Sequence, residues 1–174
     1  MSATIEEGFI EEEGFIEEEI LDEEPSKVLT YMNTDTFELV SSDVEPEGAF
    51  VEMDENIAYV ISTLNKLDYK TDWSCEGHYL HDPHKEELKE IEKTHGMCFQ
   101  DFEEGYVSFK EGIALPFIPE NWTDVVVDNH IILYAAKPKE NLISESEFFL
   151  SKFMSLISLV EWVDALPRYG ESAF

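Results

Sequence analysis

Positive charge is scarce in this sequence. It has 11 Lys and Arg residues against 40 Asp and Glu residues, and its formal net charge is −29 at pH 7. A chain with this charge is repelled by nucleic acids and by anionic membranes, and it is attracted to basic surfaces. We therefore expect no direct binding to nucleic acid or membrane. The charge favours a basic protein as the partner.

Cysteine is also scarce, with only Cys75 and Cys98 in the chain. Two cysteines do not form the disulfide framework of a small secreted protein. No basic residue precedes Lys27, so the N-terminus lacks the charged start of a signal peptide, and no apolar run is long enough to span a membrane. These absences predict a cytoplasmic protein.

Motifs that identify common enzyme classes are missing. The sequence has no Gly-rich phosphate loop, no HExxH pair and no EF-hand loop. A non-enzymatic role is therefore favoured over an enzymatic one, although a missing motif does not by itself exclude an enzyme.

The 174 residues, 43% of them hydrophobic, are enough for one domain with a buried core. We predict an acidic, flexible N-terminal arm over residues 1–25, a single domain over 26–167 and a loose C-terminal end over 168–174. Eleven acidic residues and no basic residue occupy positions 1–24, and Pro25 ends the arm.

The arm contains a short repeat, in which Gly8 to Glu13 and Gly14 to Glu19 both read Gly-Phe-Ile-Glu-Glu-Glu. One interpretation is a partner-binding segment, with Phe-Ile pairs as anchors and glutamates that meet Lys and Arg. The other is a solvated, disordered tail with a chance duplication. The partner-binding candidates are Phe9, Ile10, Glu11, Glu12, Glu13, Phe15, Ile16, Glu17, Glu18 and Glu19.

The apolar pattern of the remaining chain predicts an α+β fold. Residues 28–32 and 36–40 predict a small antiparallel hairpin, and Asp54 is a typical N-cap for a helix that reaches about Leu67. Ser144-Glu-Ser-Glu147 is a capping-box signature for a helix of roughly 20 residues. We expect a mixed or antiparallel sheet, packed by these two main helices, from strands that include Lys70, Tyr106, Val125 and Ile131.

Other segments are less regular. A short, polar surface helix is expected from Lys85 to Thr94, and a strand from Met97 to Phe109. The helix that follows Ser144 carries more apolar residues than one buried stripe needs. It is therefore either heavily buried or presents one face to a second chain, which makes it a candidate surface for oligomerisation.

Cysteines and histidines gather near the middle of the chain. Cys75-x2-His78 and His95-x2-Cys98 have the spacing of zinc-ligand pairs, with 16 residues between them. A structural role without metal is the main alternative for these residues. A third hypothesis is a nucleophilic Cys75 with His78 as its base, although His81 or His130 could equally fill that role. No cofactor is otherwise expected.

Two segments of this region are similar to a known sequence pattern. Leu64-Asn-Lys-Leu-Asp-Tyr-Lys-Thr71 followed by Ser74-Cys-Glu-Gly-His78 resembles the motif LNxxGYxTxxSCxGH of small uncharacterised proteins from bacteria and their phages. The similarity covers about residues 54–167 and leaves the acidic arm outside. Asp68 stands where the pattern has glycine. The resemblance implies a phage or prophage origin.

A more remote resemblance is to the tRNA wybutosine-synthesis methyltransferase family, in which a Ser-Cys-Ser-Gly-Arg turn opens the active site. This chain has His78 in place of that arginine.

Together these features predict an acidic accessory protein of phage type, located in the host cytoplasm. It would bind a basic, nucleic-acid-binding host protein and inhibit or redirect it by nucleic-acid mimicry, as an anti-defence or anti-CRISPR protein does. One alternative is a small ligand-binding or catalytic domain that uses the loop from Cys75 to His84. Another is a zinc-stapled interaction module.

Overall fold

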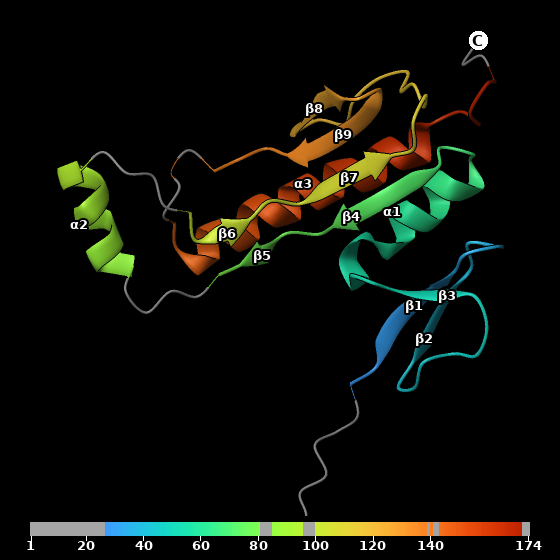
Figure 1. Ribbon diagram of the computed structural model, residues 1–174, viewed down its shortest axis with the longest axis horizontal. Coiled ribbons are helices and arrows are strands. Elements are labelled where there is room, and N and C mark those ends of the chain that lie inside the picture. The colour runs from blue at the N-terminus through green and yellow to red at the C-terminus, as the bar shows by residue number, and fades with distance from the viewer. Residues whose placement is uncertain (1–26, 81–84, 96–99, 139, 141–142, 172–174) are drawn as a thin grey trace, which may run out of the picture.

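The computed structural model describes residues 27–80, 85–95, 100–138, 140 and 143–171 (Figure 1). The acidic arm and its Phe-Ile pairs lie outside these residues. The elements, in chain order, are β1 (Leu29–Asn33), β2 (Leu39–Ser42), β3 (Phe50–Met53), α1 (Glu55–Lys66), β4 (Thr71–Cys75), β5 (His78–Tyr79), α2 (Lys85–His95), β6 (Phe102–Glu103), β7 (Tyr106–Phe109), β8 (Trp122–Val127), β9 (His130–Ala135) and α3 (Glu145–Ala165).

The described chain has the expected α+β fold. Its largest sheet has four strands in the order β4-β7-β9-β8, and all neighbouring strands are antiparallel. β9 carries the longest apolar run and occupies an interior position of the sheet, where strands are covered best. A second sheet has the order β2-β1-β3, and a two-stranded ribbon pairs β5 with β6.

One hydrophobic core joins α1 and α3 to the four-stranded sheet. α3 runs alongside β7 in Figure 1, and α1 contacts α3, β4 and β1. The core includes Leu64 of α1, Val107 of β7, Leu133 of β9 and Leu159 of α3, all with no exposed surface. Both predicted main helices therefore pack on the sheet as expected.

The start of α3 confirms its sequence signature. The Ser144 side chain accepts a bond from the backbone N–H of Glu147, and the Glu147 carboxylate accepts one from the backbone N–H of Ser144. This capping box satisfies two N–H groups that an isolated helix leaves free. The 21 residues of the helix match the predicted length.

Asp68 lies in the turn at the end of α1, at the position where the LNxxGYxTxxSCxGH motif has glycine. Asp68 has a φ of 69°, in the left-handed region that glycine enters most easily. The N–H of Tyr69 bonds to the carbonyl of Leu64, and the N–H of Asp68 bonds to that of Asn65. These two bonds form a Schellman motif, so the position needs a left-handed residue.

One strand prediction was incomplete and another was wrong. The predicted hairpin over residues 28–40 exists, but β3 adds a third strand on the other side of β1. The single strand expected from Met97 to Phe109 is two short strands, because Gly105 lies between β6 and β7 and each strand pairs with a different partner. α2 forms the expected polar helix and stands apart from the sheets in Figure 1.

Candidate functional site

The turn between β4 and β5 contains Cys75-Glu76-Gly77-His78. Gly77 has a φ of 87°, and a Cβ built on it would lie 2.8 Å from the backbone nitrogen of Gly105. A Cβ on Gly105 would in turn lie 3.0 Å from the carbonyl oxygen of Glu76. The two glycines thus allow two backbone segments to touch, which holds the turn in one position.

Asp54 occupies the N-cap position of α1, as predicted, but its side chain makes no capping bond. The sequence expectation was wrong on this point. Asp54 Oδ2 instead accepts a hydrogen bond from the backbone N–H of Glu76, at 3.1 Å. The carboxylate is therefore directed into the β4–β5 turn and away from the helix.

Glu76 takes over the capping role from across the fold. Its Oε2 accepts the backbone N–H of Asn56 in the first turn of α1, at 3.0 Å. Its Oε1 lies 2.5 Å from Nζ of Lys152 on α3, and Lys152 also donates to the carbonyl oxygen of Gly77 at 2.9 Å. Burial alone would raise the pKa of Glu76, but Lys152 and the Asn56 N–H outweigh it and lower that pKa.

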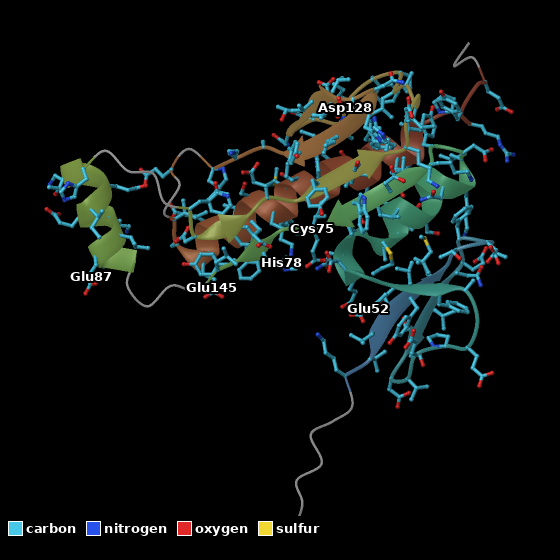
Figure 2. The ribbon with its side chains drawn as sticks, in the orientation of Figure 1. Glu52, Cys75, His78, Glu87, Asp128 and Glu145 are labelled. Carbon is cyan, nitrogen blue, oxygen red and sulfur yellow. The ribbon has the colours of Figure 1, made fainter. Side chains whose placement is uncertain are left out.

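These contacts bring three side chains of different chemistry together. One ligand atom each from Asp54, Cys75 and His78 lies within 4.8 Å of the other two. His78 Nε2 is 3.9 Å from Asp54 Oδ2, and Figure 2 shows Cys75 and His78 on neighbouring parts of the same stretch. Cys75 and Asp54 are half-buried, while His78 faces solvent.

The surroundings of Cys75 raise the pKa of its thiol in the metal-free protein. Burial raises the pKa of the thiol, a bond from the Gly77 N–H lowers it, and the carboxylates of Asp54, Glu103 and Glu76 raise it further; the net pKa lies above the usual value. Reactive cysteines have lowered pKa values, because the thiolate is the nucleophile. This environment does not favour the Cys75–His78 nucleophile hypothesis.

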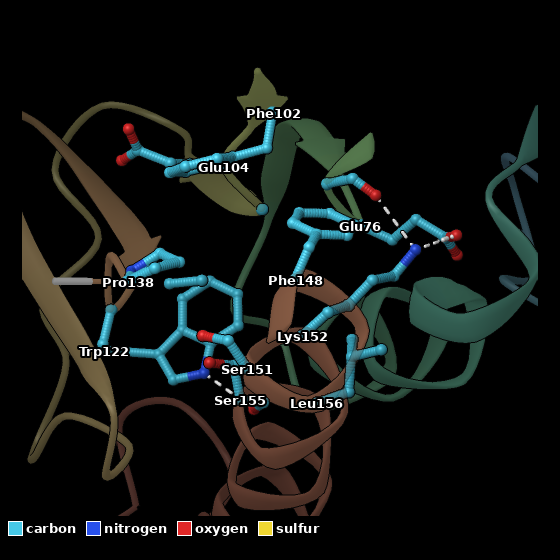
Figure 3. Close-up of a pocket in the computed structure, with 14 residues that line it drawn as sticks. Glu76, Phe102, Glu104, Trp122, Pro138, Phe148, Ser151, Lys152, Ser155 and Leu156 are labelled. Atoms are coloured by element: carbon cyan, nitrogen blue, oxygen red, sulfur yellow. Dashed lines mark hydrogen bonds and ion pairs between the residues drawn. The ribbon is translucent and has the colours of Figure 1, made fainter. Parts of the chain in front are cut away.

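A separate pocket lies between α3 and the end of the large sheet (Figure 3). Trp122, Phe148 and Leu156 line it, and the Trp122 indole N–H donates to the carbonyl oxygen of Ser155 at 2.9 Å. Lys152 and Glu76 also line the pocket, and Figure 3 shows the Lys152 amine bonded to the Glu76 carboxylate. The cavity volume is about 20 Å³, which is room for about one water molecule. The pocket is too small for an organic cofactor.

No protein-family model, curated protein or solved structure matches the chain. The resemblances to the LNxxGYxTxxSCxGH proteins and to the wybutosine-synthesis methyltransferases therefore stay predictions. Within the described residues, no helix has the length and apolar content needed to cross a bilayer.

The predicted zinc ligands are only partly placed. Cys75 and His78 lie together in the β4–β5 turn, and His95 ends α2. Cys98 lies outside the described residues, as do His81 and His84 of the proposed ligand-binding loop, so both hypotheses stay predictions. Sequence reasoning missed Asp54 as a member of the cluster, because its helix-start pattern already assigned its carboxylate to a cap.

Proposed function

We propose that this protein binds a basic, nucleic-acid-binding protein and inhibits or redirects it by presenting carboxylates in place of phosphates. The observation that supports the proposal is the distribution of charge over the folded chain. Carboxylates outnumber basic groups 40 to 11, and several basic groups of the described residues are paired within the fold.

Among the basic side chains that the structure describes, six form ion pairs with acidic side chains of the same chain. They are Lys66, Lys70, Lys89, Lys137, Lys152 and Arg168. These pairs leave few cations to offset the remaining carboxylates. The surface potential is therefore negative, which attracts basic partners and repels nucleic acid.

The exposed carboxylates are spread over the whole described molecule. Glu52 on β3, Glu87 on α2, Asp128 after β8 and Glu145 on α3 are all exposed, and Figure 2 shows them on four different parts of the fold. A nucleic acid likewise presents negative charge along its full length. A broad basic groove is the partner surface that fits this distribution.

The test starts from the nucleic-acid-binding proteins of a bacterial lysate, fractionated on heparin and passed over the immobilised full-length protein. Captured proteins are eluted with a salt gradient and identified. Each is then assayed for DNA or RNA binding with and without this protein. We expect a captured protein to lose nucleic-acid binding at near-stoichiometric addition, and its complex to weaken steeply as salt rises.

Three comparisons make the test specific. A variant with Glu52→Gln, Glu87→Gln, Asp128→Asn and Glu145→Gln should bind less tightly and with a smaller salt dependence. Removal of residues 1–25 measures how much the acidic arm contributes to the binding affinity. Polyglutamate of equal charge is the control for non-specific attraction. Binding that is indifferent to salt, or that polyglutamate reproduces, would contradict the proposal.

A further inference from the structure

We infer that Asp54, Cys75 and His78 form a binding site for one zinc-class divalent cation, with a fourth coordination position open to solvent. The inference is independent of the proposed function, since it concerns the β4–β5 turn and not the charged surface. It replaces His95 and Cys98 of the sequence-based zinc hypothesis with a residue from the start of α1.

The distances suit a tetrahedral ion. Oxygen, nitrogen and sulfur ligands at normal zinc bond lengths lie about 3.3 to 3.7 Å from one another. The Asp54–His78 pair is at 3.9 Å, and all three ligand atoms lie within 4.8 Å of each other. The three atoms are thus slightly farther apart than in a bound site, and ion binding would draw them together.

Two of the three ligand atoms are already oriented by backbone N–H groups. The Glu76 N–H donates to Asp54 Oδ2 at 3.1 Å, and the Gly77 N–H donates to Cys75 Sγ at 3.4 Å. Metal-ligating carboxylates and thiolates are commonly held by such bonds, which fix their direction. The Glu76–Lys152 pair and the Gly77–Gly105 contact in turn hold the backbone that supplies these donors.

Asp54 gives the strongest argument, because its carboxylate does not cap the helix that it precedes. A residue at an N-cap position normally bonds its own helix, but Asp54 does not, and Glu76 bonds the helix N–H of Asn56 in its place. The exchange places a carboxylate beside a cysteine and a histidine.

The donor set selects the class of ion. Thiolate and imidazole ligands suit zinc and other late first-row metals, whereas calcium and magnesium require oxygen ligands almost exclusively. Three protein ligands with one open position are typical of zinc sites that bind water or a further ligand. His78 lies beside an open pocket between β1 and the start of α1, so an ion has an entry path.

The test uses full-length, reduced, metal-free protein titrated with cobalt(II), followed by competition with zinc. Coordination by a thiolate gives cobalt a charge-transfer band in the near ultraviolet, which carboxylates alone do not produce. We expect one equivalent of cobalt with this band, displaced by one equivalent of zinc and not by calcium or magnesium.

Substitutions then identify the ligands. Asp54→Asn, Cys75→Ser and His78→Gln should each weaken zinc binding at least about tenfold, as losses around metal sites do. Asn at position 54 keeps an acceptor for the Glu76 N–H, so that variant preserves the turn. His95→Gln and Cys98→Ser are the matched controls and should leave affinity unchanged.

Three results would overturn the inference. The first is a titration without the charge-transfer band. The second is unchanged zinc affinity in Asp54→Asn. The third is a loss of affinity in His95→Gln or Cys98→Ser, which would restore the ligand set predicted from sequence. If Cys75→Ser or His78→Gln unfolds, zinc-induced shifts of the His78 ring resonances in the wild-type protein decide the question.

Discussion

Nζ of Lys152 on α3 lies 2.5 Å from Oε1 of Glu76 in the β4–β5 turn, and both side chains are nearly buried, with 12% and 13% of their surface exposed. The pair joins the C-terminal helix to the turn that carries the candidate metal ligands. Glu76 also caps α1 through Asn56, so three separate elements meet at one carboxylate.

We expect Lys152→Met to lower the free energy of unfolding by about 3 kcal/mol, because it leaves the Glu76 carboxylate buried without its partner. Urea denaturation followed by circular dichroism measures the change. Lys66→Met is the matched control, since the Lys66–Glu38 pair is exposed at 42% and 69%. That control should cost less than about 1 kcal/mol. Equal losses of unfolding free energy in the two variants would show that the buried pair stabilises the fold no more than the exposed pair does.

Gly77→Ala should destabilise the protein by at least about 2 kcal/mol, because it combines left-handed strain with a backbone collision at Gly105. Gly112→Ala is its control. Gly112 has a φ of 80° and nothing within 4 Å of a built Cβ, so only the strain remains, at about 1 kcal/mol. Thermal or urea unfolding of both variants gives the difference. Similar losses would mean that the Gly77–Gly105 contact is easily relieved.

The Arg168–Asp68 pair, 3.0 Å between Nε and Oδ2, should give an acid-dependent contribution to stability. The hydrogen bond from Arg168, with that from Lys70, lowers the pKa of Asp68 below 3.8. The unfolded chain therefore binds its proton at higher pH than the folded chain. The contribution is complete above about pH 4, near the unfolded pKa, and is lost as pH falls through the lower folded pKa.

Nuclear magnetic resonance titration of the Asp68 carboxyl group checks this prediction. In Arg168→Gln its pKa should rise towards 3.8. Urea midpoints of the wild type and Asp68→Asn should differ at neutral pH and converge at low pH. A difference that stays constant down to pH 2 would contradict the assignment.

α3 should mediate self-association at high salt. Four of its apolar side chains, Phe149, Leu150, Phe153 and Met154, are at least half exposed. The net charge of −29 opposes contact between copies at low salt, and added salt screens this repulsion. Sedimentation velocity over a salt series should show oligomers that grow with ionic strength.

Leu150→Ser with Phe153→Ser should remain monomeric over the same series. Because both side chains face solvent, the free energy of unfolding should change by less than about 0.5 kcal/mol. A wild type that stays monomeric at high salt would exclude α3 as an oligomer surface.

Several elements could be predicted because their signals are local. The capping box at Ser144 is complete within four residues, and the apolar spacing of α1 predicts both its span and its buried face. The left-handed turn at Asp68 was not predicted, because aspartate does not mark such a turn as clearly as glycine does. Strand pairing was harder: the residues before Phe109 form two strands because Gly105 contacts Gly77, which is 28 positions away.

Composition and periodicity act over short stretches of chain, and they were enough to predict the α+β class, the two packing helices and the strong negative charge. The geometry of the β4–β5 turn, in contrast, depends on contacts between residues far apart in the chain. The Asp54 carboxylate bonds the β4–β5 turn, and Glu76 caps α1 in its place. Lys152 balances the charge of Glu76 in that position. That exchange depends on contacts across 20 and 76 positions, which no local pattern encodes.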